Sequence, residues 1–177
     1  QGAGGARLAS STSTTFHVAP MTTLRVQQLL ADLGYLPLSF SPATAPSSTG
    51  VATGDLAGSF TWRWSGLPAS LTSLWSPGQP NVITQGAIMR FQDLHSMTTD
   101  GQAGPDVWAA LLADRAAGKV DPDPYNFVVV SRNLPESASV WSNGAVTFTT
   151  AVNTGIAESP TDIGTWPVYL RYRTQTM

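Results

Sequence analysis

The chain has 177 residues, of which 42% are hydrophobic and only 11% are charged, and its formal net charge is −2 at pH 7. This length allows one or two small domains, and the lack of a Lys/Arg cluster argues against nucleic acid or an anionic membrane as the main partner. The sequence contains no cysteine, which excludes disulfides, thiolate metal sites and a cysteine nucleophile within these residues. We expect no metal and no other cofactor. We also expect no membrane span, because no run of about 20 apolar residues occurs.

Residues 1–22 are rich in Gly and then in Ser and Thr, as in the run SSTSTT. This composition predicts a linker or the tail of a preceding domain. Residues 16–18 offer only a short strand, and His17 has no acidic residue or second histidine near it, so we assign it no ligand role. Because the chain begins at Gln1 rather than at Met, we expect an export signal to precede it.

A helix is predicted over residues 24–33. Thr23 is its predicted N-cap, and Gly34 stands where a left-handed C-cap is expected. The Tyr-Leu-Pro sequence at residues 35–37 then ends the helix. The apolar stripe of this helix consists of Val26, Leu29, Leu30 and Leu33.

Residues 39–81 form a long interruption before the next helix. Residues 39–55 are a low-complexity Ser/Pro/Ala/Thr/Gly stretch, which cannot bury enough apolar surface to order itself. Residues 58–64 alternate apolar and polar side chains and predict a strand. A short helix is predicted over residues 68–75, and a turn over residues 77–80.

The aromatic residues of this interruption allow two interpretations. Trp62, Trp64 and Trp75 lie within fourteen residues, and aromatic faces can stack on the C–H faces of sugar rings. Alternatively, Phe60, Trp62 and Trp64 share one face of the strand and cover a helical core, since large aromatics supply much of the burial in small domains. We favour the packing interpretation.

Residues 82–112 predict a helix, a turn and a second helix. Arg90, Gln92 and Asp93 lie off the apolar stripe of the first helix, which we expect to stop at residues 97–99. The stripe comprises Ile83, Ala87, Phe91 and Leu94. His95 follows with no nucleophile or carboxylate partner at a recognisable spacing, so we assign it a structural or solvent-facing role.

The turn between these two helices begins at Asp100 and Gly101. Gly101 can adopt a positive φ without steric cost, and Asp100 is expected to hold the turn through its own backbone. Gly104 and Pro105 begin the second helix. The first residue of a helix has no partner for its N–H, so proline, which lacks this group, suits that position. The apolar face of this helix comprises Val107, Trp108, Leu111 and Leu112.

Residues 116–124 hold a glycine and two prolines and predict an exposed linker. Beyond them the hydrophobic period changes from that of a helix to that of a strand. Asn143-Gly144 is a strong hairpin signal, and residues 153–155 break the strand that follows it. The predicted strands are residues 125–131, 138–142, 145–152 and 165–172.

Residues 24–38 and 82–112 resemble the three-helix peptidoglycan-binding domain of bacterial cell-wall enzymes. Its pattern runs through a VQQLL-like helix, GYLP, a helix with xxFQ, and DGxxGPxxW. Residues 34–37 match GYLP, and residues 100–108 match DGxxGPxxW. The family usually joins the first two helices by a short loop, whereas about forty residues intervene here.

Residues 125–172 resemble the opening strands of the L,D-transpeptidase catalytic domain. The segments that carry this resemblance are VVVSRNLPE, VWSNG, AVNTG and SPTDIGTWPVYLR. Members of that family often carry a peptidoglycan-binding domain just upstream, so the two resemblances support each other. The family often reads T-P-x-G-x-F where this chain has SPTDIGTW at residues 159–166.

In that family a cysteine thiolate attacks a carbonyl of the donor stem peptide, a histidine acts as base, and backbone N–H groups stabilise the oxyanion. This chain has no cysteine, and both of its histidines lie outside the β region. We therefore assign no catalytic residue, and the chain as given should not perform transpeptidation. We expect it to be a fragment of a longer cell-wall enzyme.

Together the resemblances imply an α+β fold. A three-helix peptidoglycan-binding-like domain spans residues 23–115 with an insertion at 39–81, and antiparallel strands of an incomplete L,D-transpeptidase-like domain span residues 125–177. The implied function is to bind and target peptidoglycan, through stem peptide or glycan strand, outside the cytoplasm. The alternatives are a non-catalytic wall-binding module and the targeting part of a peptidoglycan hydrolase.

The resemblance also implies which residues matter. A minority interpretation gives the Asp100 carboxylate a hydrogen bond from a muropeptide amide. The ligand-binding candidates are Tyr35, Trp62, Trp64, Arg90, Gln92 and Asp100. The residues expected to shape the fold are Gly34, Pro37, Phe91, Gly101, Gly104, Pro105 and Trp108.

Overall fold

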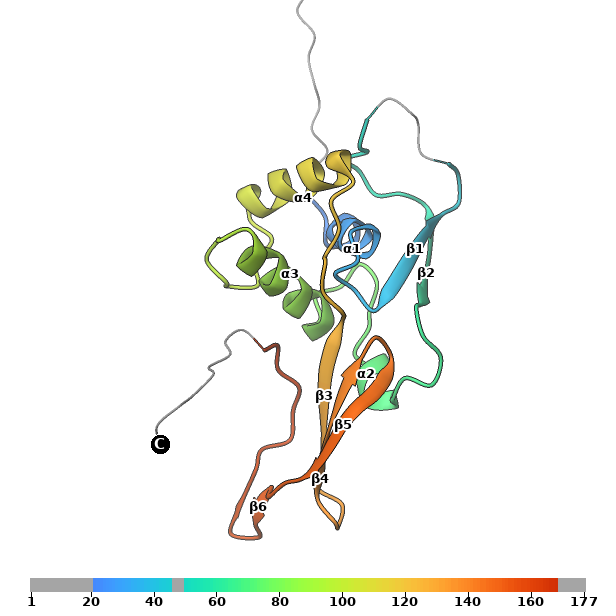
Figure 1. Ribbon diagram of the computed structural model, residues 1–177. Coiled ribbons are helices and arrows are strands. Elements are labelled where there is room, and N and C mark those ends of the chain that lie inside the picture. Colours follow the sequence, from blue (N-terminus) through green and yellow to red (C-terminus); the bar gives the residue numbers. More distant parts are fainter. Residues whose placement is uncertain (1–20, 46–49, 169–177) are drawn as a thin grey trace, which may run out of the picture.

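The computed structural model describes residues 21–45 and 50–168 (Figure 1). In this part of the chain the fold is mixed α+β, as predicted, with helices and antiparallel sheets. The helices are α1 (Thr23–Asp32), α2 (Ala69–Thr72), α3 (Val82–Leu94) and α4 (Pro105–Ala117). The strands are β1 (Leu38–Pro42), β2 (Gly58–Trp62), β3 (Asn126–Ser131), β4 (Ser137–Ser142), β5 (Ala145–Ala151), β6 (Gly155–Ile156) and β7 (Ser159–Pro160). The predictions for His17 and for residues 16–18 and 169–172 lie outside the described residues.

Helix α1 begins one residue earlier than predicted. The side-chain oxygen of Thr22 accepts a 3.0 Å hydrogen bond from the Arg25 N–H, so Thr22 is the N-cap and the assignment to Thr23 is wrong. At the other end, Gly34 has a φ of 83°, the left-handed conformation that was predicted. All four residues of the predicted apolar stripe are buried.

Helix α3 begins after Asn81, whose side chain accepts a 2.9 Å hydrogen bond from the Thr84 N–H. The helix ends at Leu94, before the predicted stop at residues 97–99. Leu94 is 39% exposed and does not belong to the buried stripe, whereas Ile88 does. Leu94 is the last residue of α3 and does not belong to the core.

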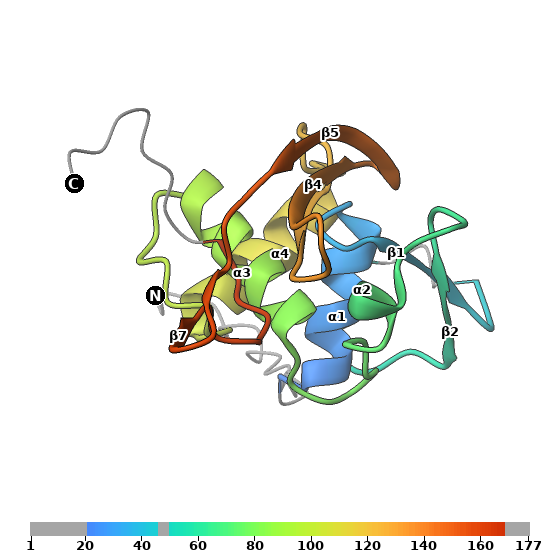
Figure 2. The ribbon, with the colours of Figure 1, turned by 90° about the horizontal axis from the view of Figure 1, so that it is seen from below.

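Helix α4 begins at Pro105, as predicted, with Gly104 as its N-cap. It ends at Ala117, and its C-cap Gly118 has a φ of 65°. Helices α1, α3 and α4 surround one hydrophobic core, and Figures 1 and 2 both show α1 lying between the β1–β2 pair and the other two helices. The side chains in this core with no exposed surface are Leu29, Leu30, Leu36, Phe91 and Leu111.

The inserted segment is more ordered than its composition predicts. Strand β1 pairs antiparallel with β2, with Phe40 opposite Phe60, so the expectation that residues 39–55 would not order is wrong for residues 39–42. Phe40 is 9% exposed and contributes to the helical core. Strand β2 ends at Trp62, so Trp64 does not lie in the strand with Phe60 and Trp62.

The second unit is a three-stranded antiparallel sheet in the order β3-β4-β5. Its β4–β5 turn has positive φ values at Asn143 and Gly144, which confirms the predicted hairpin. Residues 165–168 are not in a strand, which corrects that part of the predicted last strand, because no described segment pairs with them. No helix of the described ranges is long and apolar enough to cross a membrane.

Candidate functional site

The turn that carries the DGxxGPxxW motif is held by Gln92 of α3. The Gln92 side chain is buried, and its Nε2 donates to Asp100 Oδ1 at 2.6 Å and to the Gln102 carbonyl oxygen at 3.1 Å. Its Oε1 accepts a 2.8 Å hydrogen bond from the Gly101 N–H. Gln92 points into the protein although it lies off the apolar stripe, and it connects α3 to the turn.

Asp100 and Gly101 complete this turn. Asp100 Oδ1 accepts a 2.9 Å hydrogen bond from the Gln102 N–H. That backbone donor, followed by the Gln92 amide, lowers the pKa of Asp100. Gly101 has a φ of 70°, and a Cβ there would lie 2.7 Å from Cγ of Gln85, so both conformation and space require glycine.

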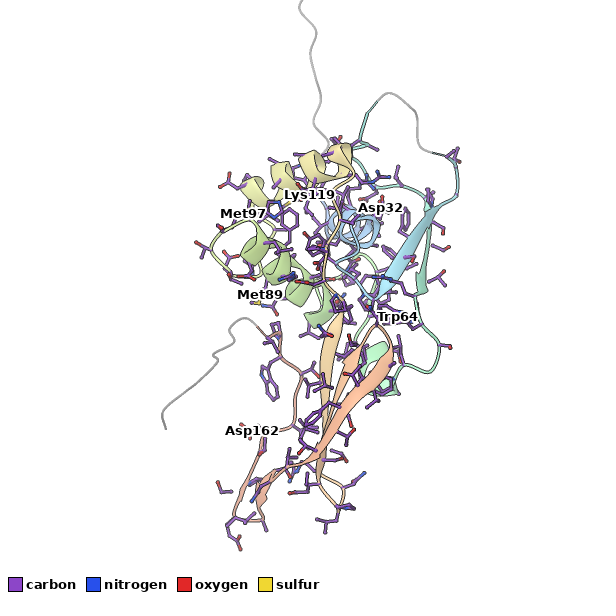
Figure 3. All side chains as sticks on the ribbon, in the orientation of Figure 1. Asp32, Trp64, Met89, Met97, Lys119 and Asp162 are labelled. Atoms are coloured by element: carbon purple, nitrogen blue, oxygen red, sulfur yellow. The ribbon has the colours of Figure 1, made fainter. Side chains whose placement is uncertain are left out.

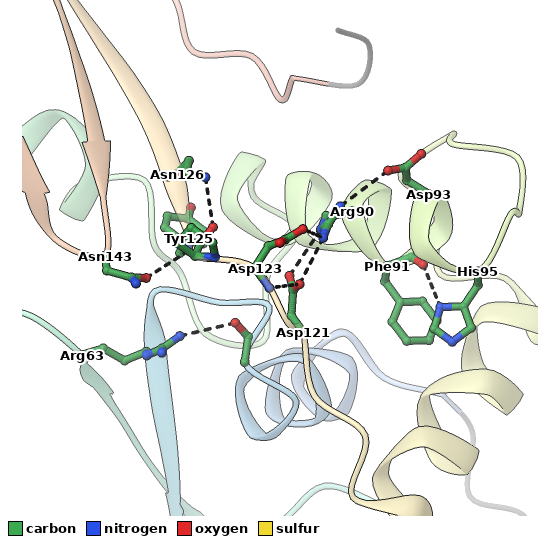
Figure 4. A network of polar contacts seen from close by, with 12 residues as sticks. Arg63, Arg90, Phe91, Asp93, His95, Asp121, Asp123, Tyr125, Asn126 and Asn143 are labelled. Atoms are coloured by element: carbon green, nitrogen blue, oxygen red, sulfur yellow. Dashed lines mark hydrogen bonds and ion pairs between the residues drawn. The ribbon is translucent and has the colours of Figure 1, made fainter. Parts of the chain in front are cut away.

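Arg90, another ligand-binding candidate, forms ion pairs within the protein (Figure 4). Its Nη2 lies 3.2 Å from Asp121 Oδ1 and also pairs with Asp123, and its Nη1 lies 3.6 Å from Asp93. Burial opposes the charge of Arg90, but the hydrogen bonds and charges of Asp121 and Asp123 outweigh it and raise its pKa. Arg90 therefore fastens residues 121–123 to α3.

Tyr35 lies in the core and is only 4% exposed. Its ring meets Phe91 edge to face, with 5.3 Å between ring centroids. Burial raises the pKa of Tyr35 to about 12, and the carboxylates of Asp121 and Asp114 add to the effect. This position makes Tyr35 part of the packing between α1 and α3.

The tryptophan candidates occupy different surroundings. Trp62 is partly buried and packs against the helical core, as the packing interpretation predicts. Trp64 stacks on Tyr125, which precedes β3, with 6.4 Å between centroids. The structure thus does not gather the six candidates into one site: two form the Asp100 turn, Arg90 holds residues 121–123, and the aromatic residues lie elsewhere.

The remaining motif positions are structural in their placement. Pro37, Phe91 and Trp108 are buried. The two glycines that begin and end the inter-helix turn, Gly101 and Gly104, lie at a positive φ and at the N-cap of α4.

His95 does have a carboxylate partner, contrary to the sequence prediction. Its Nε2 lies 3.0 Å from Asp114 Oδ2, its Nδ1 lies 2.9 Å from the Phe91 carbonyl oxygen, and its ring stacks on Phe91. Lys119 Nζ lies 3.4 Å from the same carboxylate oxygen. Asp114 is nineteen residues away along the chain, on α4, and spacing along one helix does not reveal such a pair. The contact joins α3 to α4.

A hollow of about 480 Å³ lies between α1 and the inserted segment. Sequence reasoning missed it because it depends on the pairing of β1 with β2. Phe60 lies 5.1 Å from both Phe40 and Trp75, measured between ring centroids. The lining residues are Leu24, Gln28, Phe40, Leu56, Gly58, Ser59, Phe60, Trp75 and Pro77.

The side-chain amide of Gln28, which lines this hollow, already has hydrogen-bond partners within the protein. Its Oε1 accepts from the Leu56 N–H at 3.1 Å and from Arg25, and its Nε2 donates to the Leu56 carbonyl at 2.8 Å. Arg25 in turn donates to the Ala52 carbonyl oxygen from Nε and Nη2. These two buried side chains hold the inserted segment on α1, and the hollow offers mainly apolar and aromatic surface.

The chain is similar in sequence to a curated bacterial enzyme. No family model and no solved structure gives a match. A zinc D-Ala-D-Ala carboxypeptidase of Streptomyces albus G is 29% identical over 153 residues, which cover 75% of this chain and 57% of that protein. The chain therefore spans little more than half the length of this relative.

The name of that relative includes zinc, which proteins bind through His, Cys, Asp and Glu side chains. Across residues 21–45 and 50–168, no group of three or more His, Cys, Asp or Glu side chains is placed to hold a metal ion. The residues that the structure describes therefore do not fit a zinc site.

Proposed function

We propose that this chain is the peptidoglycan-binding and targeting portion of an extracytoplasmic cell-wall protein. The observation that carries the proposal is the similarity to the D-Ala-D-Ala carboxypeptidase over 75% of the chain. The GYLP and DGxxGPxxW motifs support it, because the first lies where α1 ends and the second joins α3 to α4, and these three helices share one core. Attachment to the polymer would raise the effective concentration of an enzyme at its substrate.

We further propose that helices α1, α3 and α4 form a peptidoglycan-binding domain of the three-helix type, with residues 39–81 inserted between its first two helices. The β3-β4-β5 sheet would be the start of an L,D-transpeptidase domain. Its thiolate and histidine would then come from a segment outside these 177 residues, since the chain has no cysteine. The sheet exposes apolar side chains, which supports the proposal that a further part of the domain covers it. These side chains are Val128, Val130 and Phe148.

A peptidoglycan hydrolase is the second candidate for the parent protein. The name of the Streptomyces relative favours it, because a carboxypeptidase hydrolyses a peptide bond. Reading the coding DNA beyond Met177 discriminates between the candidates. A frame that continues through His-Gly to Gly-Cys supports the transpeptidase, a new metal-binding motif supports the hydrolase, and an early stop codon supports a binding module.

The binding proposal is tested by sedimenting the full chain with purified sacculi. We expect the chain in the pellet with sacculi and in the supernatant with cellulose, an insoluble glycan that lacks stem peptides. A chain that is folded by circular dichroism but stays in the supernatant with sacculi would refute the proposal.

A second arm tests whether the hollow beside α1 contacts the wall. Pro77 lines the hollow and is exposed, so Pro77→Trp adds an indole beside it without replacing a core residue. Retention that falls with Pro77→Trp but not with Thr61→Trp, at an exposed position on the β2 face opposite Phe60, would place the contact there. Equal retention would place it on another surface.

A further inference from the structure

The inserted segment meets the second unit at Trp64 (Figure 3). Trp64 lies against Gly144, in the turn between β4 and β5, so closely that a Cβ at Gly144 would overlap Cβ and Cγ of the tryptophan. The absence of a side chain at residue 144 thus allows the turn to rest on the indole ring.

Tyr125 links this contact to the start of β3. Its ring stacks on Trp64 with an interplanar angle of 30°. Asn143 fixes the tyrosine backbone on both sides: the Asn143 N–H donates to the Tyr125 carbonyl oxygen at 3.0 Å, and Asn143 Oδ1 accepts from the Tyr125 N–H at 3.1 Å (Figure 4). The hairpin turn and the beginning of β3 are therefore joined to each other and both contact one indole.

Arg63 connects the same indole to the helical unit, which is formed by α1, α3 and α4. Its guanidinium lies 4.6 Å from the ring centroid of Trp64, a cation–π distance. Its Nη1 lies 3.4 Å from the carbonyl oxygens of Gly34 and Leu36, and its backbone N–H donates to the Pro37 carbonyl at 3.0 Å. The chain just after α1 thereby supports the position of Trp64.

We propose that Arg63 and Trp64 form a docking platform for the β4–β5 hairpin, and that this platform gives the β sheet one fixed orientation on the helical unit. Units joined only by a linker are expected to move relative to each other. Here the ion pairs of Arg90 with Asp121 and Asp123 hold the segment just before β3, and Phe127 of β3 packs against the helical core. The platform adds a contact at the hairpin turn, so the sheet is held at more than its linker.

The platform assigns a role to the insertion that goes beyond wall binding. If the helical unit binds peptidoglycan, as proposed above, the platform also sets where the sheet lies relative to the bound polymer. The platform itself requires no ligand, so it can be tested without wall material. Its failure is therefore distinct from a failure to bind sacculi.

The experiment measures the distance between the units by pulsed electron paramagnetic resonance. The chain has no cysteine, so Ala109→Cys on α4 and Ala151→Cys on β5, both exposed, place one spin label on each unit. We expect one narrow distance distribution in this background. Trp64→Ala should replace it with a broad distribution, whereas Trp166→Ala, at an exposed tryptophan, should keep it narrow.

A glycine pair provides a second test in case Trp64→Ala fails to fold. Gly144→Ala and Gly118→Ala both place a methyl group at a positive φ, but only the first meets Trp64, because nothing lies within 4 Å of a Cβ at residue 118. We expect a broad distribution for Gly144→Ala and a narrow one for Gly118→Ala. A narrow distribution in both Trp64→Ala and Gly144→Ala would overturn the proposal.

Discussion

Gln92 on α3 and Asp100 in the following turn are joined by a 2.6 Å hydrogen bond from the amide nitrogen to the carboxylate. The same amide group satisfies the Gly101 N–H, so one side chain fixes three consecutive residues of the turn. This arrangement joins the FQ of α3, at residues 91–92, to the DG of the turn, at residues 100–101, in this chain.

Replacing Gln92 by leucine should destabilise the protein. The substitution leaves the Gly101 N–H without its acceptor in a buried position, which costs about 2 kcal/mol. Urea unfolding followed by circular dichroism measures the free energy of unfolding. Gln102→Leu is the matched control, since the Gln102 side chain is exposed and only its backbone takes part in the turn. Equal stability of the two variants would contradict the role assigned to Gln92.

Asp100 should contribute a pH-dependent part of the stability. Its pKa is lowered from an ordinary 3.8 by the Gln102 N–H and the Gln92 amide, so the folded state favours the carboxylate. The contribution is therefore present above that ordinary value and is lost as the pH falls through the lowered pKa. We expect the stability difference between the native chain and Asp100→Asn to shrink over this range, as measured by urea unfolding at successive pH values. A constant difference would argue against it.

Local patterns predicted much of the secondary structure. The helical period of α1, the proline at the start of α4 and the Asn143-Gly144 turn each depend on residues close in sequence. The pairing of β1 with β2 was not predicted, because the two strands are far apart in the sequence and β1 lies in a stretch of Ser, Pro and Ala. The inserted segment is ordered by this pairing and by Gln28, which binds the backbone of Leu56.

The candidate site was less predictable than the fold. A motif identifies positions but not the direction of each side chain, and Gln92 was placed off the buried face because a polar residue does not count toward an apolar stripe. Arg90 could not be matched to Asp121, since that pair requires the chain after α4 to return to α3. Trp64 contacts a turn eighty residues later, which no local pattern encodes.

Arg90→Leu should lower the free energy of unfolding by about 2 kcal/mol, because the Asp121 carboxylate, with 9% of its side chain exposed, loses its cation. Asp93→Asn removes the more exposed pair of the same arginine and should change stability by less than about 0.5 kcal/mol. Both values follow from urea unfolding. If Asp93→Asn lowered the free energy of unfolding as much as Arg90→Leu, the stabilisation by Arg90 could not be assigned to its pair with Asp121.

The apolar face of the β3-β4-β5 sheet should cause the isolated chain to self-associate. Phe148 is 58% exposed on β5, and Val128 and Val130 of β3 are 55% and 53% exposed. Val140 of β4 pairs with both Val128 and Phe148, so these side chains share one face. Apolar surface gathered on one face promotes association. We expect Phe148→Thr, which keeps a residue suited to strands, to reduce self-association in sedimentation-velocity experiments.

Leu134→Thr is the control for that substitution. Leu134 is 89% exposed but lies in the loop between β3 and β4, away from the shared face. It should leave the sedimentation profile unchanged, because a single exposed leucine does not form a patch. If the two variants reduced association equally, general hydrophobicity rather than the sheet face would be the cause of the association.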